Sequence, residues 1–304
     1  MKIAVLDIGG TSIKSGVIEN ETLQEKIETP VNASLGGASL METAKKIIAC
    51  YPGFDRIGIS TAGQVDSEKG IIRYANQNIP GYTGMRVKEI FEDAFSVPVI
   101  VENDVNAAAI GEAVYGAGQE ASTALKQDFL CLTFGAGIGG AIVIDGKVYK
   151  GASFSAGEVG HIITHGRVAF DGASDGAPGG GENGYYEKYA STAALVKNVQ
   201  TVFPKLDDGR KIFLNLGQSA VRKIVDAWID EVLYGLASLI HIFNPSLVVL
   251  GGGIMEEGYV IESLQQRIGR HIMPSFREVV LARAALGNDA GLWGAGYLAR
   301  IKPH

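Results

Sequence analysis

The feature that most constrains the fold is a pattern of strand, glycine turn and strand that occurs once in each half of the chain. The two copies are Ile3–Leu6, Gly9-Gly10-Thr11 and Ile13–Ile18, and then Phe129–Phe134, Gly135–Gly140 and Ala141–Ile144. Apolar runs of this length on either side of glycines are typical of β-hairpins. The repetition therefore predicts two halves that each open with a hairpin.

Helical and strand patterns alternate between these hairpins, which predicts an α/β fold. Helices are expected at 38–50, 87–95, 106–117, 185–202, 219–243, 259–271 and 288–301, and strands at 56–60, 98–101 and 246–250. A length of 304 residues fits two domains. We expect these at 1–118 and 119–304 around a central cleft, with the last helix, about 288–301, returning to the first domain.

Composition excludes several classes of protein. Hydrophobic residues make up 46% and charged residues 20%, and the formal net charge is -6 without any dense Lys/Arg run, so no nucleic-acid partner is expected. No apolar stretch reaches the ~18 residues of a membrane span, and the first residues do not resemble a secretory leader. Cys50 and Cys131 have no second cysteine at metal or redox spacing and are expected to be buried thiols. These features predict a cytoplasmic protein without a membrane partner.

The glycine turns are candidate phosphate-binding loops. Asp7 ends a strand just before Gly9, Gly10 and Thr11, where backbone amides could hold phosphate oxygens while Asp7 orients Mg²⁺ through water. A plain hairpin turn is the alternative. The run Gly135–Gly140 precedes a strand rather than the helix of a dinucleotide-binding site. Two such turns, one in each half, suggest two loops that close on one polyphosphate.

Asp104 lies where the strand 98–101 gives way to a helix, a place at which ligands often bind in α/β proteins. Its carboxylate could serve as a general base toward an attacking hydroxyl. Aspartate is also a good helix cap, and this alternative stays open.

Polar side chains downstream are candidates for binding vicinal hydroxyls. They are Glu158, His161 and Glu187. A zinc site at His161 lacks ligands because no cysteine follows Cys131, whereas a structural histidine stays an alternative. Gly251-Gly252-Gly253 after an apolar strand would let an adenine or ribose approach the backbone, or would simply form a strand-to-helix turn.

In this order the motifs resemble the ROK family of the actin-like ATPase superfamily, over nearly the whole chain. The resemblance implies two actin-like (ribonuclease H-like) domains around a cleft, and a sugar kinase that uses ATP and Mg²⁺ and forms a homodimer. It implies Asp104 as the catalytic base and a sugar site of Gly63, Asn78, Asn103, Glu158, His161 and Glu187. The implied nucleotide site comprises Asp7, Gly9, Gly10, Thr11, Lys14, Gly135, Ala136, Gly137, Gly251, Gly252 and Gly253.

The chain departs from the family pattern at two places. Pro178–Gly184 stands where many members carry a zinc-binding cysteine cluster, so no structural zinc is expected, and Ala136 stands where threonine is frequent. The expected acceptor is a hexose or N-acetylhexosamine, phosphorylated at its 6-hydroxyl, with a β-glucoside or fructose as the alternative. A sugar-sensing transcriptional regulator is the non-enzyme alternative. The acidic chain, which begins directly with the loop-bearing strand, favours the kinase. A binding protein without catalysis is a further alternative, against which Asp7 and Asp104 argue.

Overall fold

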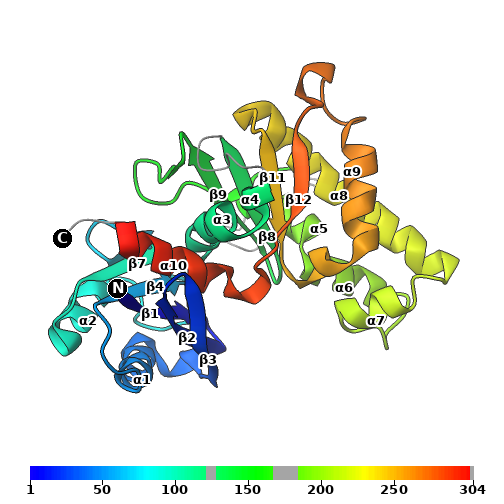
Figure 1. The fold of residues 1–304 in the computed structure, drawn as a ribbon. Coiled ribbons are helices and arrows are strands. Elements are labelled where there is room, and N and C mark those ends of the chain that lie inside the picture. The colour runs from blue at the N-terminus through cyan, green and yellow to red at the C-terminus, as the bar shows by residue number, and fades with distance from the viewer. Residues whose placement is uncertain (121–127, 167–183, 302–304) are drawn as a thin grey trace. The chain divides into compact units, whose positions relative to one another are not determined.

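A computed structural model describes residues 1–120, 128–166 and 184–301. The chain divides into two compact units. Unit 1 comprises Met1–Lys126, Ala141–Ala156 and Ala285–His304, and unit 2 comprises Gln127–Gly140 and Gly157–Ala284. The α/β class is confirmed, whereas the domain boundary expected at residues 118 and 119 stays a prediction (Figure 1).

Unit 1 is built on a five-stranded sheet with the order β3-β2-β1-β4-β7. Its strands are β1 (Lys2–Ile8), β2 (Ser12–Glu19), β3 (Thr22–Pro30), β4 (Arg56–Thr61) and β7 (Val99–Asn103). The first three strands pair antiparallel, and β1, β4 and β7 pair parallel. The first hairpin is therefore as expected, with Gly9–Thr11 at its turn. A small separate sheet joins β5 (Gln64–Asp66) to β6 (Ile71–Tyr74).

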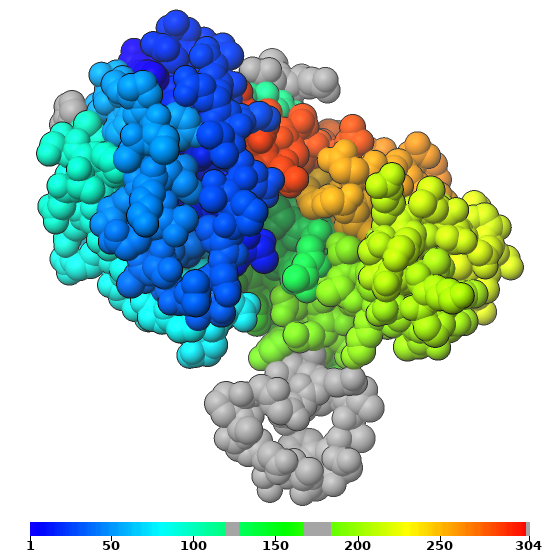
Figure 2. All heavy atoms as spheres, turned by 90° about the horizontal axis from the view of Figure 1, so that it is seen from below, coloured from blue at the N-terminus to red at the C-terminus, as the bar shows by residue number. Residues whose placement is uncertain are grey.

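Helices cover both faces of this sheet because side chains alternate along each strand. The even-numbered residues from Ala4 to Ile8 pack in a core with α1 (Gly37–Ala49) and α2 (Val87–Phe95). Ile3 and Val5 face the other way and pack with Leu292 of α10 (Ala290–Ile301). The blue to cyan residues of this unit form one continuous body in the space-filling view (Figure 2).

Backbone-to-backbone contact holds α10 against α3 (Asp104–Tyr115) and the sheet (Figure 1). A Cβ added at Gly294 would lie 1.7 Å from the carbonyl oxygen of Ala107, and one at Gly58 of β4 would lie 2.5 Å from that of Ala295. Neither position has room for any side chain. The buried carboxylate of Glu112 accepts the backbone N–H groups of Ala285 and Leu286 at 2.9 and 2.8 Å, which fixes the segment that leads into α10.

Unit 2 carries most of a second sheet with the order β10-β9-β8-β11-β12. Its strands are β8 (Phe129–Phe134), β9 (Ile138–Ile144), β10 (Lys147–Val148), β11 (Leu247–Gly251) and β12 (Val280–Arg283). The helices of unit 2 are α5 (Tyr186–Ala190), α6 (Thr192–Gln200), α7 (Gly209–Leu214), α8 (Ser219–Phe243) and α9 (Gly258–Ile268). The buried Trp228 of α8 donates to the carbonyl oxygen of Ala190 at 3.0 Å, so α8 and the end of α5 share the core.

The structure corrects two expectations. The helix expected at 185–202 is two helices, because Ser191 caps α6 by accepting the N–H of Ala194. Cys50 is exposed at the end of α1 rather than buried, whereas Cys131 is buried. No helix in the described part of the chain is both long and apolar enough to cross a bilayer.

Candidate active site

The turn between β1 and β2 leaves its amides available to an anion. The carbonyl oxygens of Gly10 and Thr11 accept the N–H groups of Ala33 and Val31 at 3.4 and 2.9 Å. The N–H groups of Gly10 and Thr11 donate no hydrogen bond within the described residues. Successive unpaired amides in a glycine turn form a concave site for phosphate oxygens. The loop therefore has the amide arrangement of a phosphate site, and its binding of phosphate stays a prediction.

Asp7 is held at the end of β1 by two neighbours. Ser60 Oγ donates to Asp7 Oδ1 at 2.7 Å, and Lys14 Nζ lies 3.4 Å from Asp7 Oδ2. A Cβ added at Gly291 of α10 would lie 3.1 Å from Oδ1, so the helix backbone closes the other side. This leaves lone pairs on a partly exposed, oriented carboxylate, and hard oxygen donors of this kind suit a hydrated Mg²⁺.

Asp104 is the first residue of α3 and directly follows the residue that caps this helix. Asn103 is the N-cap, and its Oδ1 accepts the N–H groups of Val105 and Asn106, both at 3.0 Å. Asn103 Nδ2 donates to Asp104 Oδ1 at 2.8 Å and to the carbonyl oxygen of Gly63 at 3.0 Å. The amide of Asn103 thus holds the first turn of α3, the carbonyl of Gly63 and one oxygen of Asp104 together. Its expected contact with sugar stays a prediction.

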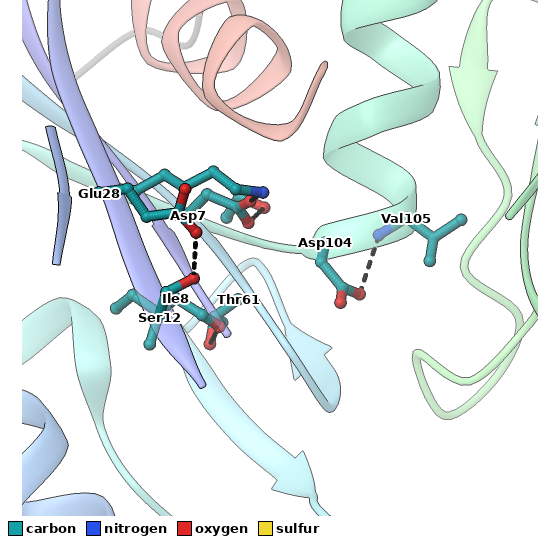
Figure 3. A network of polar contacts seen from close by, with 9 residues as sticks. Asp7, Ile8, Ser12, Glu28, Thr61, Asp104 and Val105 are labelled. Carbon is teal, nitrogen blue, oxygen red and sulfur yellow. Dashed lines mark hydrogen bonds and ion pairs between the residues drawn. The ribbon is translucent and has the colours of Figure 1, made fainter. Parts of the chain in front are cut away.

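The side chain of Asp104 lies at the start of α3, with one carboxylate oxygen directed at the N–H of Val105 (Figure 3). Burial, and after it the negative charge of Asp7, raises the pKa of Asp104 to about 6, against the lowering effect of hydrogen bonds from Val105 and Asn103. Its Oδ1 accepts the N–H of Val105 at 2.9 Å and Asn103 Nδ2 at 2.8 Å, and no other described residue is seen to donate to Oδ2. One oxygen is therefore anchored and the other is available to a proton donor.

Sequence reasoning missed a buried hydroxyl pair close to Asp104. Thr61 Oγ1 and Tyr82 Oη lie 2.7 Å apart, and both residues are buried. Burial, with a contribution from the charge of Asp104, raises the pKa of Tyr82 to about 12. The pair ties the segment that contains Asn78 to the end of β4. Asn78 itself is exposed, and its part in binding sugar stays a prediction.

Unit 2 brings its two glycine segments together because β8 and β11 are adjacent parallel strands. A Cβ added at Gly252 would lie 2.2 Å from the carbonyl oxygen of Phe134, at the start of the turn Gly135–Gly137. Ala193 N–H donates to the carbonyl oxygen of Gly135 at 3.3 Å. The amides of Ala136 and Gly137 donate to no described residue, which repeats the arrangement of the first loop.

The predicted sugar residues of unit 2 differ in exposure. Glu187 is the most enclosed of the three, and a Cβ added at Gly137 would lie 2.5 Å from its Oε2. His161 is 57% exposed, with Nδ1 3.9 Å from Glu158 Oε2. No group of three His, Cys, Asp or Glu in the described part of the chain could hold a metal ion, and the expectation of no zinc at 178–184 lies almost wholly outside that part.

The structure therefore gathers the expected residues into two groups. The unit 1 group contains Asp7, Gly9, Gly10, Thr11, Lys14, Gly63, Asn103 and Asp104, and the unit 2 group contains Gly135, Ala136, Gly137, Gly251, Gly252, Gly253 and Glu187. That both groups meet on one nucleotide stays a prediction.

Comparison with known proteins gives a family match over almost the entire length. The model described as the ROK family matches residues 3–302. A β-glucoside kinase of Klebsiella pneumoniae is 31% identical over 305 residues, which cover 98% of this chain and 95% of that protein.

Solved structures are similar over the same length. A protein described as a putative N-acetylmannosamine kinase from Listeria monocytogenes has a TM-score of 0.84 at 28% identity, covering 98% of each chain. A ROK family glucokinase from Streptomyces griseus, solved in complex with glucose and AMPPNP, has a TM-score of 0.79 at 29% identity and covers 99% of this chain and 100% of its own.

Proposed function

Because the chain belongs to the ROK family, we propose that it is a sugar kinase that transfers the terminal phosphoryl group of ATP to a hydroxyl of a hexose or N-acetylhexosamine. The observation that carries this proposal is the Asp104 carboxylate, with its pKa raised to about 6 and its Oδ2 available. Such a group is ionised at neutral pH and still basic enough to accept a proton from an alcohol as the phosphorus–oxygen bond forms.

In the proposed mechanism the chain binds the phosphates, orients the base and takes the proton from the sugar hydroxyl. The unpaired amides of Gly10 and Thr11, and those of Ala136 and Gly137, would hold phosphate oxygens. Asp7 would hold Mg²⁺ through water, and bound Mg²⁺ supplies charge neutralisation on the phosphates. Asn103 keeps Asp104 Oδ1 in place, so that Oδ2 receives the proton of the attacking hydroxyl.

The substrate belongs to the finer part of the proposal. The relatives named above act on a β-glucoside, N-acetylmannosamine or glucose by their descriptions, which supports a six-carbon sugar or its N-acetyl derivative. We favour the primary 6-hydroxyl as acceptor, with a β-glucoside or fructose as alternative substrates. A homodimer in the cytoplasm stays part of the prediction.

The test is a coupled assay of ADP release with ATP, Mg²⁺ and a panel of glucose, N-acetylmannosamine, fructose and a β-glucoside. We expect sugar-dependent ADP release, with the phosphorylated carbon identified by NMR of the product, and a loss of about 10²-fold or more in kcat for D104N. Near-normal turnover of D104N would remove Asp104 from the role of base. Absence of ADP release with every sugar, together with a promoter-DNA mobility shift, would favour the regulator instead.

A further inference from the structure

Lys150 forms an ion pair whose partner is buried beside the candidate base. Lys150 follows β10, in the segment 141–156 that belongs to unit 1. Its Nζ lies 3.6 Å from Glu102 Oε2 and also donates to Ser67 Oγ. The side chain of Lys150 is 27% exposed and that of Glu102 only 4%. Lys150 therefore supplies the positive charge for the Glu102 carboxylate, which water hardly reaches.

Glu102 connects this pair to the turn that bears the base. It lies in β7 directly before Asn103, and its Oε1 accepts the backbone N–H of Asn103 at 3.1 Å. The same oxygen accepts from Asn106 Nδ2 at 3.3 Å. One carboxylate thus binds the residue before Asp104 and the residue two positions after it. A shift of this carboxylate would move both sides of the turn.

A second contact fixes the segment that carries Lys150. Ser155 Oγ donates to Gln64 Oε1 at 2.8 Å, and Gln64 is three positions before Ser67 in the chain. The 141–156 segment is therefore attached to residues 64–67 at two points. This anchoring reduces the conformational entropy that a long lysine side chain loses when it forms an ion pair.

A buried carboxylate without a cation is strongly disfavoured, and it would either take up a proton or move toward water. We propose that Lys150 is a positioning residue for phosphoryl transfer: by pairing with Glu102 it holds the Asn103-Asp104 turn in the geometry that the base requires. The inference rests on the proposed function, because it takes Asp104 as the base. It assigns Lys150 no contact with ATP or sugar.

The experiment compares K150M, K150R, E102Q and the double variant E102Q/K150M. K45M is the matched control, since Lys45 is 28% exposed and, among the described residues, pairs with the exposed Glu42 in the helix α1. We expect K150M to lower kcat by about 10-fold to 10²-fold, because small misplacement of a catalytic group has effects of that size, with the KM for sugar and ATP changed less than about twofold. K150R should recover most of kcat. The double variant should exceed K150M in kcat, because the neutral amide introduced by E102Q leaves no unpaired charge.

Hydrogen exchange of backbone amides separates this inference from the proposed function. We expect faster exchange in residues 103–110 of K150M than of wild type, with K45M unchanged and the double variant intermediate. If wild type phosphorylates no sugar, the proposed function fails, and unchanged exchange in K150M would then overturn the positioning role as well. If wild type is active, a K150M variant with the kcat of K45M overturns it. Should K150M not fold, failure of E102Q to restore folding in the double variant would also overturn it.

Discussion

Replacing Asp104 by Asn should stabilise the protein while inactivating it. Folding raises the pKa of this carboxyl from 3.8 to about 6, so keeping it ionised in the native state costs free energy. A shift of about two pKa units at about 1.4 kcal/mol per unit corresponds to about 3 kcal/mol. Because residue Asp104 as a whole is only partly buried, solvent screening reduces this figure, and we expect D104N to gain about 2 kcal/mol at pH 8.

The sign of the effect fixes its pH dependence. Between about pH 4 and pH 6 the native state keeps the Asp104 proton that the unfolded chain has released, so the stability of wild type falls as pH rises through this window. The side-chain amide that D104N introduces does not titrate. The advantage of D104N should therefore be near zero below about pH 4 and complete above about pH 7.

Urea unfolding at pH 4.5 and pH 8, followed by tryptophan fluorescence, measures the difference in the free energy of unfolding. D93N is the control, because Asp93 lies exposed on α2 and a substitution there should change stability by less than about 0.5 kcal/mol. A D104N variant that is no more stable than wild type at pH 8 would refute the reasoning. So would an equal gain at both pH values, since charge desolvation could not be its cause.

Three further predictions concern catalysis and packing. The acid limb of kcat/KM should have an apparent pKa of about 6, with the rate falling about tenfold per pH unit below it, and a limb near pH 4 would contradict the environment of Asp104. G294A should lose at least about 3 kcal/mol of stability or fail to fold, because its Cβ would lie 1.7 Å from the Ala107 carbonyl oxygen, whereas G217A, with open space, should differ little from wild type in thermal unfolding. Chelation of divalent metal should abolish ADP release, and added Mg²⁺ should restore it; activity that persists without metal would contradict the proposed role of Asp7.

Strongly periodic segments could be predicted from the sequence to within a residue or two. The helices at 87–95 and 219–243 and the strand at 129–134 have the bounds that their apolar spacing indicated. The edge strand β3 could not be found in this way, because most of its side chains are exposed and no apolar alternation marks it. The prediction of a single helix over 185–202 was wrong, because Ser191 interrupts the helical run and caps a second helix.

The candidate site was predictable where chemistry follows chain order. Asp104 was found because a strand ends and a helix begins there. The sequence left open whether Asp104 caps that helix, and in the structure Asn103 does. Ser60 was missed because its contact with Asp7 depends on the parallel register of β1 and β4, which pairs the two residues. Lys150 is 48 positions from Glu102, and no periodicity connects them.

The packing of α10 on β1, β4 and α3 also bears on how the protein is made. One face of the unit 1 sheet, including the side on which Asp7 lies, is covered by residues 290–301, which a ribosome adds after all of unit 2. Unit 1 therefore cannot complete its core co-translationally as an independent amino-terminal domain, even though nascent domains usually fold in order of synthesis. In ribosome-stalled chains that end before Ala290, the Asp7 carboxylate should lack its contact with α10. Unit 1 should then be sensitive to proteolysis.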